Sequence, residues 1–231
     1  MPLESHFRPS IGNRRHGADA GHERRCYSEG MELLLVRHAL PLRVEREDGL
    51  PADPPLSEEG LSQAERLAQW IASEPIDALY ASPLRRAQET AQPVAKSLGL
   101  EIQVEPGVTE FDSLSSVYIP LEELKALDYE RWRSMMDGGL IEGIDFPEFC
   151  RVAIASFERI IAKSGGKRVV VVCHGGVVNI WAAHVLGMDT SLFFEPDYTS
   201  ISRFLAAASG ERSLASLNET AHLRSLAIPS R

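Results

Sequence analysis

The run Arg168–Cys173, which reads Arg-Val-Val-Val-Val-Cys, restricts the fold of this 231-residue chain more than any other segment. Four consecutive valines favour a strand buried on both faces, because β-branched side chains suit a pleated surface that is covered above and below. Residues 32–36, Glu-Leu-Leu-Leu-Val, form a second short apolar run of the same kind. Such strands are typical of parallel sheets with helices on both faces, so the two runs predict an α/β fold.

Helix and strand patterns alternate along the chain after Met31. Apolar residues recur at helical spacing in five segments, at residues 58–71, 83–98, 120–137, 147–164 and 176–186. Ser57 and Ser82 are the expected N-caps of the first two helices, with Pro83 at the first position of the second. Further strands are expected at residues 76–81, 101–104, 202–206 and 213–217. The alternation predicts three layers, with a largely parallel central sheet flanked by helices.

Residues 1–30 differ in composition from the rest of the chain. They are rich in Arg, His, Gly and Ser, and their apolar residues show no periodicity. They carry a net charge of +1, whereas residues 31–231 carry −10. We interpret residues 1–30 as a disordered or non-native N-terminal extension, the second alternative placing the true start at Met31. Residues 31–231 are then expected to form a single domain.

The net charge of the whole chain, −9, excludes some classes of function. A general nucleic-acid binder needs a basic surface, so we expect no nucleic-acid partner. No apolar run approaches the ~20 residues that span a bilayer, so we expect no membrane partner. Three scattered cysteines, Cys26, Cys150 and Cys173, are too few for a disulfide framework or a thiolate metal site. This pattern favours a cytoplasmic, reduced protein without a metal.

Basic side chains follow three of the expected strands at the points where the strands end. Arg37 and His38 follow the first strand, His174 follows the valine run, and Arg85 and Arg86 follow the strand at residues 76–81. In open α/β sheets the ligand site lies beyond the carboxyl ends of the strands, so we expect these residues at one edge. Each group alone is more typical of a packing pair or a solvated helix face, but together they indicate a cationic site.

A site of this composition suits a phosphoryl group. Arginine offers planar, multidentate donors to phosphate oxygens, and a helix that starts after Gly175 and Gly176 adds the partial positive charge of its first N–H groups. A neutral histidine nitrogen can attack phosphorus and form a covalent phosphohistidine. The cations then stabilise the charge on the equatorial oxygens in both steps. We therefore predict a small phosphorylated substrate.

Five separated motifs resemble those of the histidine phosphatase superfamily, which includes the cofactor-dependent phosphoglycerate mutases. They occur in family order, as LVRHA at residues 35–39, PLSEEGLSQA at 55–64, SPLRRAQET at 82–90, VCHGG at 172–176 and LNETAHL at 217–223. The last motif is similar to a segment of bacterial phosphatases of the family. The resemblance implies the phosphoglycerate mutase-like fold with a helical cap insertion, and it favours the phosphatase branch.

The resemblance also implies a role for each matched residue. His38 corresponds to the nucleophile that becomes phosphorylated, and His174 to the second histidine of the phosphate pocket. Arg37 and Arg86 correspond to the residues that bind the phosphoryl oxygens. Arg86, not Arg85, is the arginine that precedes the alanine of the motif.

The general acid of the family follows the third strand, where this chain reads Val-Thr-Glu-Phe-Asp. Glu110 aligns best with it, and Asp112 is the alternative. The acid would protonate the leaving oxygen and then take a proton from the hydrolytic water. With these roles the resemblance implies a histidine acid phosphatase-type phosphomonoesterase that needs neither a metal nor a cofactor.

The chain departs from the mutases of the family in two respects. They have Asn six residues after the nucleophile, where this chain has Val44, so Arg43 or Arg46 is a candidate for the missing phosphate donor. Only 63 residues separate the expected acid from the second histidine, where mutases have a longer insertion. A shorter cap, at about residues 113–146, admits water and favours hydrolysis. A mutase-type phosphotransferase and a non-catalytic phospho-ligand binding module are the alternatives.

Overall fold

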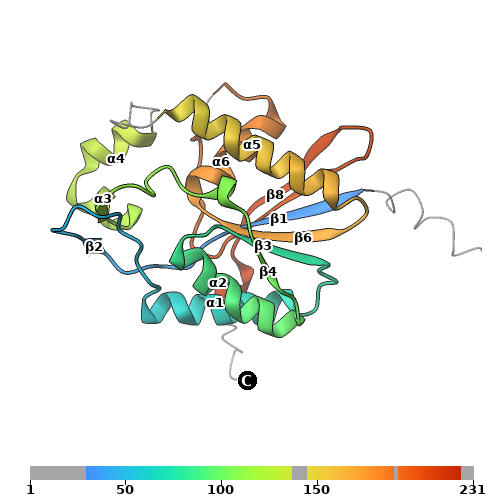
Figure 1. Ribbon diagram of the computed structural model, residues 1–231, viewed down its shortest axis with the longest axis horizontal. Coiled ribbons are helices and arrows are strands. Elements are labelled where there is room, and N and C mark those ends of the chain that lie inside the picture. The colour runs from blue at the N-terminus through green and yellow to red at the C-terminus, as the bar shows by residue number, and fades with distance from the viewer. Residues whose placement is uncertain (1–29, 137–144, 190–191, 225–231) are drawn as a thin grey trace, which may run out of the picture.

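The computed structural model describes residues 30–136, 145–189 and 192–224 (Figure 1). Most of the expected extension, residues 1–29, and part of the expected cap, residues 137–144, lie outside these ranges. Within them, the helices and strands alternate along the chain as the sequence predicts.

A six-stranded sheet forms the centre of the molecule. Its strands lie in the order β4 (Ile102–Val104), β3 (Ala78–Ala81), β6 (Arg168–Cys173), β1 (Met31–Arg37), β7 (Ile201–Ala206) and β8 (Arg212–Glu219). The first four are parallel to one another, while β7 and β8 run antiparallel to their neighbours. The prediction of a largely parallel sheet is confirmed, and its valine run occupies the interior of the sheet.

Helices cover both faces of this sheet and complete the three layers (Figure 1). The helices α1 (Glu58–Ile71) and α2 (Arg85–Leu98) lie on one face, and α5 (Phe146–Lys163) and α6 (Gly175–Leu186) lie on the other. Alternate residues of β1 point to opposite faces, as the strand period requires. Leu33 packs in the cluster that contains Phe157 and Trp181, whereas Leu34 packs in the cluster with Leu67 and Val94.

Short elements lie beyond the carboxyl ends of the parallel strands (Figure 1). The strands β2 (Val44–Glu45) and β5 (Val117–Tyr118) form a separate pair, and the helices α3 (Leu121–Leu127) and α4 (Tyr129–Met136) follow β5. Two 3-10 turns, η1 (Pro106–Val108) and η2 (Ala221–Leu223), complete the described elements. The helices α3 and α4 fall in the segment expected as the cap.

The prediction of one continuous helix over residues 120–137 is wrong. The helix breaks at Asp128, whose φ of −146° and ψ of 79° are not helical. The Asp128 carboxylate accepts a hydrogen bond from the backbone N–H of Arg131 at 3.0 Å. Aspartate is a strong N-cap, so it starts a new helix where the apolar pattern alone suggested continuity.

The first predicted helix start is confirmed, and the second is wrong. Ser57 caps α1, and its hydroxyl accepts from the Gly60 N–H at 3.0 Å. The helix α2 begins at Arg85, not at Pro83, and its first N–H donates to the Asp53 carboxylate at 2.8 Å. An aspartate distant in the sequence therefore binds the first N–H of the helix, while the Ser82 hydroxyl accepts from the Leu84 N–H, before the helix, at 3.3 Å.

The start of α1 packs directly against the segment that follows β1. The Leu40 carbonyl accepts from both the N–H and the hydroxyl of Ser57, each at 3.0 Å. A Cβ atom placed on Gly60 would lie only 2.1 Å from the Leu40 oxygen. Glycine is therefore required at this buried position because the two backbones touch.

We predict that Gly60→Ala lowers the free energy of unfolding by about 1–3 kcal/mol, because the added methyl group must displace a backbone carbonyl. Gly165→Ala is the matched control, since a Cβ on Gly165 would meet nothing within 4 Å. Urea denaturation of both variants measures the difference. Equal stability of the two variants would contradict the required close approach.

Candidate active site

Three neighbouring strands end side by side and set the positions of the candidate residues. The register pairs Ala81 of β3 with Val172 of β6, and Arg37 of β1 with Cys173 of β6. The ladder continues past the strand ends, because the His38 N–H donates to the Cys173 carbonyl at 2.9 Å. The structure therefore brings His38 and His174 together, with 5.0 Å between their ring centroids.

The His38 side chain is buried and oriented by a single backbone group. Its Nδ1 lies 2.8 Å from the carbonyl oxygen of Ala39. A carbonyl can only accept, so Nδ1 carries the proton and the lone pair is on Nε2. Burial, followed by the positive charges of Arg86 and Arg37, holds the pKa of His38 well below its usual value. The ring is therefore a neutral base with Nε2 available.

His174 begins α6 and is also kept neutral. Its Nε2 lies 2.8 Å from the Ser82 hydroxyl, at the end of β3. Burial and then the charge of Arg86 hold the pKa of His174 well below its usual value, with smaller effects from His38 and Arg37. Ser82, expected as a helix cap, instead orients this second histidine.

Arg37 is almost fully buried beside the two histidines. Its Nη1 donates to the Pro196 carbonyl at 2.5 Å, and its guanidinium lies 3.7 Å from the centroid of the Tyr198 ring. The Glu122 carboxylate of α3 approaches Nη1 at 3.6 Å. One carbonyl, one aromatic face and one half-exposed carboxylate thus hold the cation.

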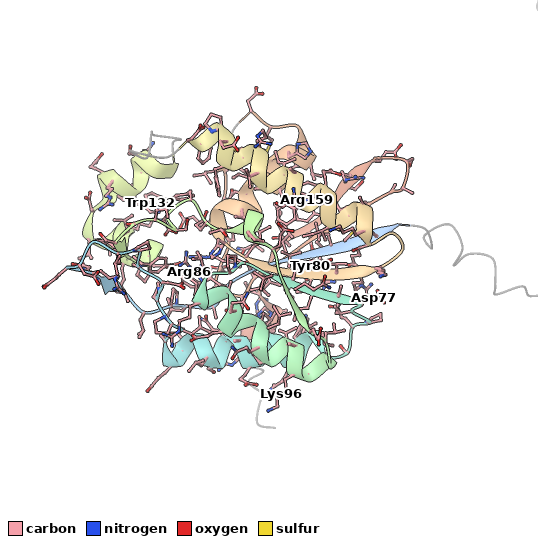
Figure 2. All side chains as sticks on the ribbon, in the orientation of Figure 1. Asp77, Tyr80, Arg86, Lys96, Trp132 and Arg159 are labelled. Atoms are coloured by element: carbon pink, nitrogen blue, oxygen red, sulfur yellow. The ribbon has the colours of Figure 1, made fainter. Side chains whose placement is uncertain are left out.

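Arg86, labelled in Figure 2, is the second residue of α2. Its side chain is 1% exposed. Its Nη2 donates to the Asp112 carboxylate at 3.1 Å, and its guanidinium lies 4.6 Å from the centroid of the Tyr118 ring. The pattern of partners repeats that of Arg37, with an aromatic ring and a carboxylate. This arrangement agrees with the expectation that both arginines lie at the same edge of the sheet as the two histidines.

Several buried nitrogen atoms at this edge have no hydrogen-bond partner among the described residues. They are Nε of Arg37, Nε of Arg86 and Nδ1 of His174. Buried polar atoms are nearly always paired in folded proteins, so such a group of atoms indicates a ligand. Guanidinium donors in this number suit the oxygens of a phosphoryl group.

Glu110 follows η1 and packs against the start of α6. Its Oε2 accepts from the Gly176 N–H at 2.9 Å, and its Oε1 accepts from the Phe111 N–H at 3.1 Å. A Cβ on Gly176 would lie 2.5 Å from Oε1, so glycine there makes room for the carboxyl group. Burial, and then the negative charge of Asp112, raises the pKa of Glu110 to about 7.

The two candidate acids have different partners. Asp112 is the counter-ion of Arg86, and its side chain is 30% exposed. Within the described residues, the Glu110 carboxylate accepts hydrogen bonds only from backbone N–H groups. Its pKa of about 7 allows it to give and take a proton near neutral pH. These differences support Glu110 as the acid–base group.

The structure does not bring Arg43 or Arg46 to this edge. The Nε of Arg43 donates to Glu45 at 3.0 Å, and that of Arg46 donates to Asp48 at 2.9 Å. Both side chains are more than one-third exposed. Arg43 also approaches the Glu123 carboxylate of α3 at 3.9 Å. That Arg43 or Arg46 replaces the family asparagine, whose place Val44 takes in this chain, stays a prediction.

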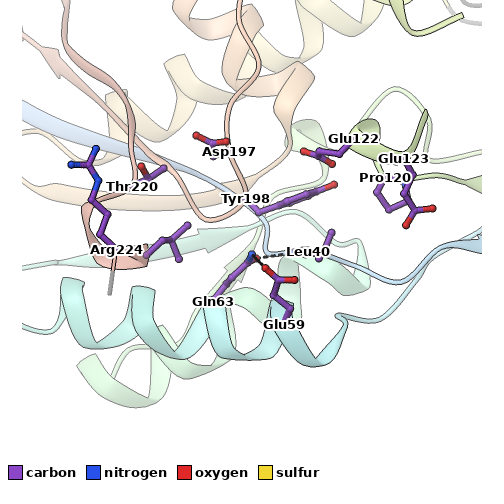
Figure 3. Close-up of a pocket in the computed structure, with 11 residues that line it drawn as sticks. Leu40, Glu59, Gln63, Pro120, Glu122, Glu123, Asp197, Tyr198, Thr220 and Arg224 are labelled. Carbon is purple, nitrogen blue, oxygen red and sulfur yellow. Dashed lines mark hydrogen bonds between the residues drawn. The ribbon is translucent and has the colours of Figure 1, made fainter. Parts of the chain in front are cut away.

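A pocket with a volume of about 540 Å³ lies beside Tyr198 and Glu122. Figure 3 shows residues that line it. The pocket is lined by Tyr198, whose ring centroid lies 5.7 Å from that of His38, and by Glu122, the partner of Arg37. The other lining residues come from the segment after β1, from α1, α3 and the segment before β7, and from the C-terminal residues, and include Leu40, Glu59, Gln63, Glu123, Asp197, Thr220, Leu223 and Arg224. No motif in the sequence indicated Tyr198 or Glu122, because both reach the site only through the tertiary fold.

Comparison with known proteins agrees with this fold. The model of the family described as "Histidine phosphatase superfamily (branch 1)" matches residues 33–220 of this chain. The phosphoserine phosphatase 1 of Hydrogenobacter thermophilus is 32% identical over 170 residues, covering 71% of this chain and 80% of that protein. A Yersinia enterocolitica protein named "Probable phosphoglycerate mutase GpmB" is 29% identical over 164 residues, covering 68% of this chain and 76% of its own length.

A crystal structure of phosphoserine phosphatase from Entamoeba histolytica, in complex with 3-phosphoglyceric acid, has the same fold. It superimposes with a TM-score of 0.65 at 25% sequence identity, covering 84% of this chain and all of that one. The chain belongs to the histidine phosphatase superfamily, which confirms the resemblance seen in its motifs.

Two further features are absent from the described residues. No group of three or more His, Cys, Asp or Glu side chains in that part of the chain is arranged to hold a metal ion. No helix within the same residues is both long and apolar enough to cross a membrane.

We predict that Asp112→Asn lowers the pKa of Glu110 below about 7, because the variant removes a neighbouring negative charge and frees the charge of Arg86. The pKa should stay above the ordinary value of 4.5, since burial is the larger cause and persists. Carbon-13 NMR titration of the Glu110 carboxyl measures it. Asp77→Asn, at the opposite end of β3, is the control, and an unchanged pKa in Asp112→Asn would refute the assignment.

Proposed function

We propose that this protein is a metal-independent phosphomonoester hydrolase that acts through a phosphohistidine on His38. The observation that carries the proposal is the pair of neutral, buried histidines held between two buried arginines. A site that is rigid, cationic and buried stabilises phosphoryl charge without reorganising during the reaction. Membership of the family supports the same reaction class.

In the first step, the lone pair of His38 Nε2 forms a bond to phosphorus while the bond from phosphorus to the ester oxygen breaks. Glu110, protonated at and below a pH of about 7, gives its proton to the leaving oxygen. The products are an alcohol and the phosphohistidine. Arg37, Arg86 and His174 hold the equatorial oxygens throughout the step.

In the second step, a water molecule attacks phosphorus and the bond to Nε2 breaks. Glu110, now a carboxylate, accepts a proton from this water and returns to its starting form. Inorganic phosphate leaves, and His38 is again neutral. A group with a pKa near 7 suits both roles, because neither protonation state is costly to reach at neutral pH.

Charges around the pocket favour a hydrolase over a mutase. Four carboxylates line it, from Glu59, Glu122, Glu123 and Asp197, against one lining cation, Arg224. A bisphosphorylated intermediate would place its second phosphate among these carboxylates, where like charges repel. We therefore propose that the leaving group carries no strong negative charge. An isomerisation assay with a sugar-acid monophosphate, with and without bisphosphate, would reveal the rival activity.

We predict that His38→Ala lowers the rate of 4-nitrophenyl phosphate hydrolysis, measured with a chelator present, by at least about 1000-fold, because the nucleophile is lost. Rapid quenching with labelled substrate should trap an acid-labile, base-stable phosphoryl label on the wild type and none on the variant. His184→Ala, which alters an exposed histidine of α6, should keep both the rate and the label. Equal rates for His38→Ala and wild type would rule out the mechanism.

We predict that Glu122→Gln changes the preference between leaving groups. The variant should raise kcat/KM for 3-phosphoglycerate relative to glycerol phosphate by about threefold to tenfold, because one carboxylate of the pocket is neutralised. Glu122→Gln can also act through Arg37, which binds the phosphate of both substrates. Taking the ratio of the two kcat/KM values cancels this shared effect. Glu101→Gln, before β4 and away from the pocket, is the control. An unchanged ratio would show that Glu122 does not select the leaving group.

A further inference from the structure

Residues 196–200 form a support beneath Arg37 and His38, at the entry to β7. The Pro196 carbonyl and the Tyr198 ring hold the Arg37 guanidinium, as described above. The backbone is held as well: the Arg37 N–H donates to the Ser200 carbonyl at 3.2 Å, and the Thr199 N–H donates to the Arg37 carbonyl at 3.0 Å. The position of the phosphate-binding guanidinium therefore depends on the conformation of this support.

That conformation is strained at its centre. Thr199 has a φ of 57°, in the left-handed region that β-branched residues rarely adopt. Such a conformation persists only where surrounding contacts over-determine it. Asn218 is the other non-glycine residue with positive φ among the described residues, also at 57°.

Thr199 and Asn218, the two residues with positive φ, lie in segments that are joined by hydrogen bonds. The Asn218 side chain accepts from the Asp197 N–H at 2.7 Å and donates to the Asp197 carboxylate at 2.9 Å. The His222 Nε2 lies 3.1 Å from the Thr199 hydroxyl. Three hydrogen bonds thus join the support to the end of β8 and to η2, more than 20 residues further along the chain.

The turn η2, at the C-terminal end of these hydrogen bonds, is held in place by α1. His222 is 9% exposed, and its ring centroid lies 6.3 Å from that of Trp70 on α1. Arg66 of the same helix donates to the Leu223 carbonyl at 3.3 Å. The helix α1, whose start packs against Leu40, therefore also holds η2, and His222 of η2 is hydrogen-bonded to the support at residues 196–200.

We propose that Asn218 and His222 are positioning residues for the phosphate site. They hold residues 196–200 in the strained conformation that presents Arg37, although neither residue contacts the reacting atoms. The inference rests on the proposed function, because it takes Arg37 as a phosphate ligand. It assigns a part in phosphate binding to Asn218 and His222, neither of which lines the pocket.

Four variants separate positioning from general stability. His222→Ala removes the bond to Thr199, and His222→Gln keeps an amide that can replace it. Asn218→Ala removes the bonds to Asp197, and Asn218→Gly removes the same bonds while it tolerates positive φ. The control is Glu158→Gln, which weakens the ion pair from α5 to Arg212 on β8, away from the support.

The measurements are the Kd of inorganic phosphate by calorimetry, kcat and KM for 4-nitrophenyl phosphate, and the midpoint of urea unfolding. His222→Ala, Asn218→Ala and Asn218→Gly should each raise the Kd and the KM about 5- to 10-fold, the effect of one lost hydrogen bond passed on to Arg37. His222→Gln should stay within about threefold of wild type, and Glu158→Gln should not change the Kd.

Each result decides between the inferences. If His222→Ala and both Asn218 variants keep the wild-type Kd while their unfolding midpoints fall, the contacts are only structural and the inference is wrong. If the wild type binds phosphate but does not hydrolyse the ester, the proposed function fails and the Kd comparison still tests the positioning role. If the wild type does not bind phosphate, both are overturned.

Discussion

Two guanidinium groups are buried at the carboxyl edge of the sheet, and the chemistry of the site depends on the cost of keeping them there. A buried charge must be paired or solvated by protein dipoles. Arg37 and Arg86 each receive one carboxylate and one aromatic face, which leaves their Nε donors unpaired within the described residues. The partners hold the cations in place without using all their donors, so the site is built for an anion.

Burial acts in opposite directions on the pKa of the histidines and on that of Glu110, while the nearby arginines lower both. The charges of Arg86 and Arg37 add to burial in lowering the pKa of His38 and His174, so the proposed nucleophile His38 is neutral. Arg86 also lowers the pKa of Glu110, but burial and Asp112 outweigh it and the pKa stays near 7. The proposed nucleophile and the proposed proton donor therefore coexist within one buried cluster, because their environments push the pKa values of His38 and Glu110 in different directions.

Local patterns in the sequence predicted the parts of this arrangement that local physics determines. The valine run and residues 32–36 gave the central strands, and their ends located Arg37, His38 and His174. The failures have long-range causes. Asp53, not Ser82, satisfies the start of α2, and a carboxylate cap divides the expected helix at Asp128. The contacts of residues 196–200 join segments more than 20 residues apart, where periodicity carries no information.

The antiparallel strands explain why such contacts are possible. In a wholly parallel sheet each strand would begin at the edge opposite the site. Because β7 runs against β1, its first residue pairs with Val36 and its entry lies beside Arg37. The strand β8 then returns, and its last residue pairs with the start of β7. The pair thus delivers two chain segments to the site, and the hydrogen bonds between them can hold Thr199 in a conformation that neither would keep alone.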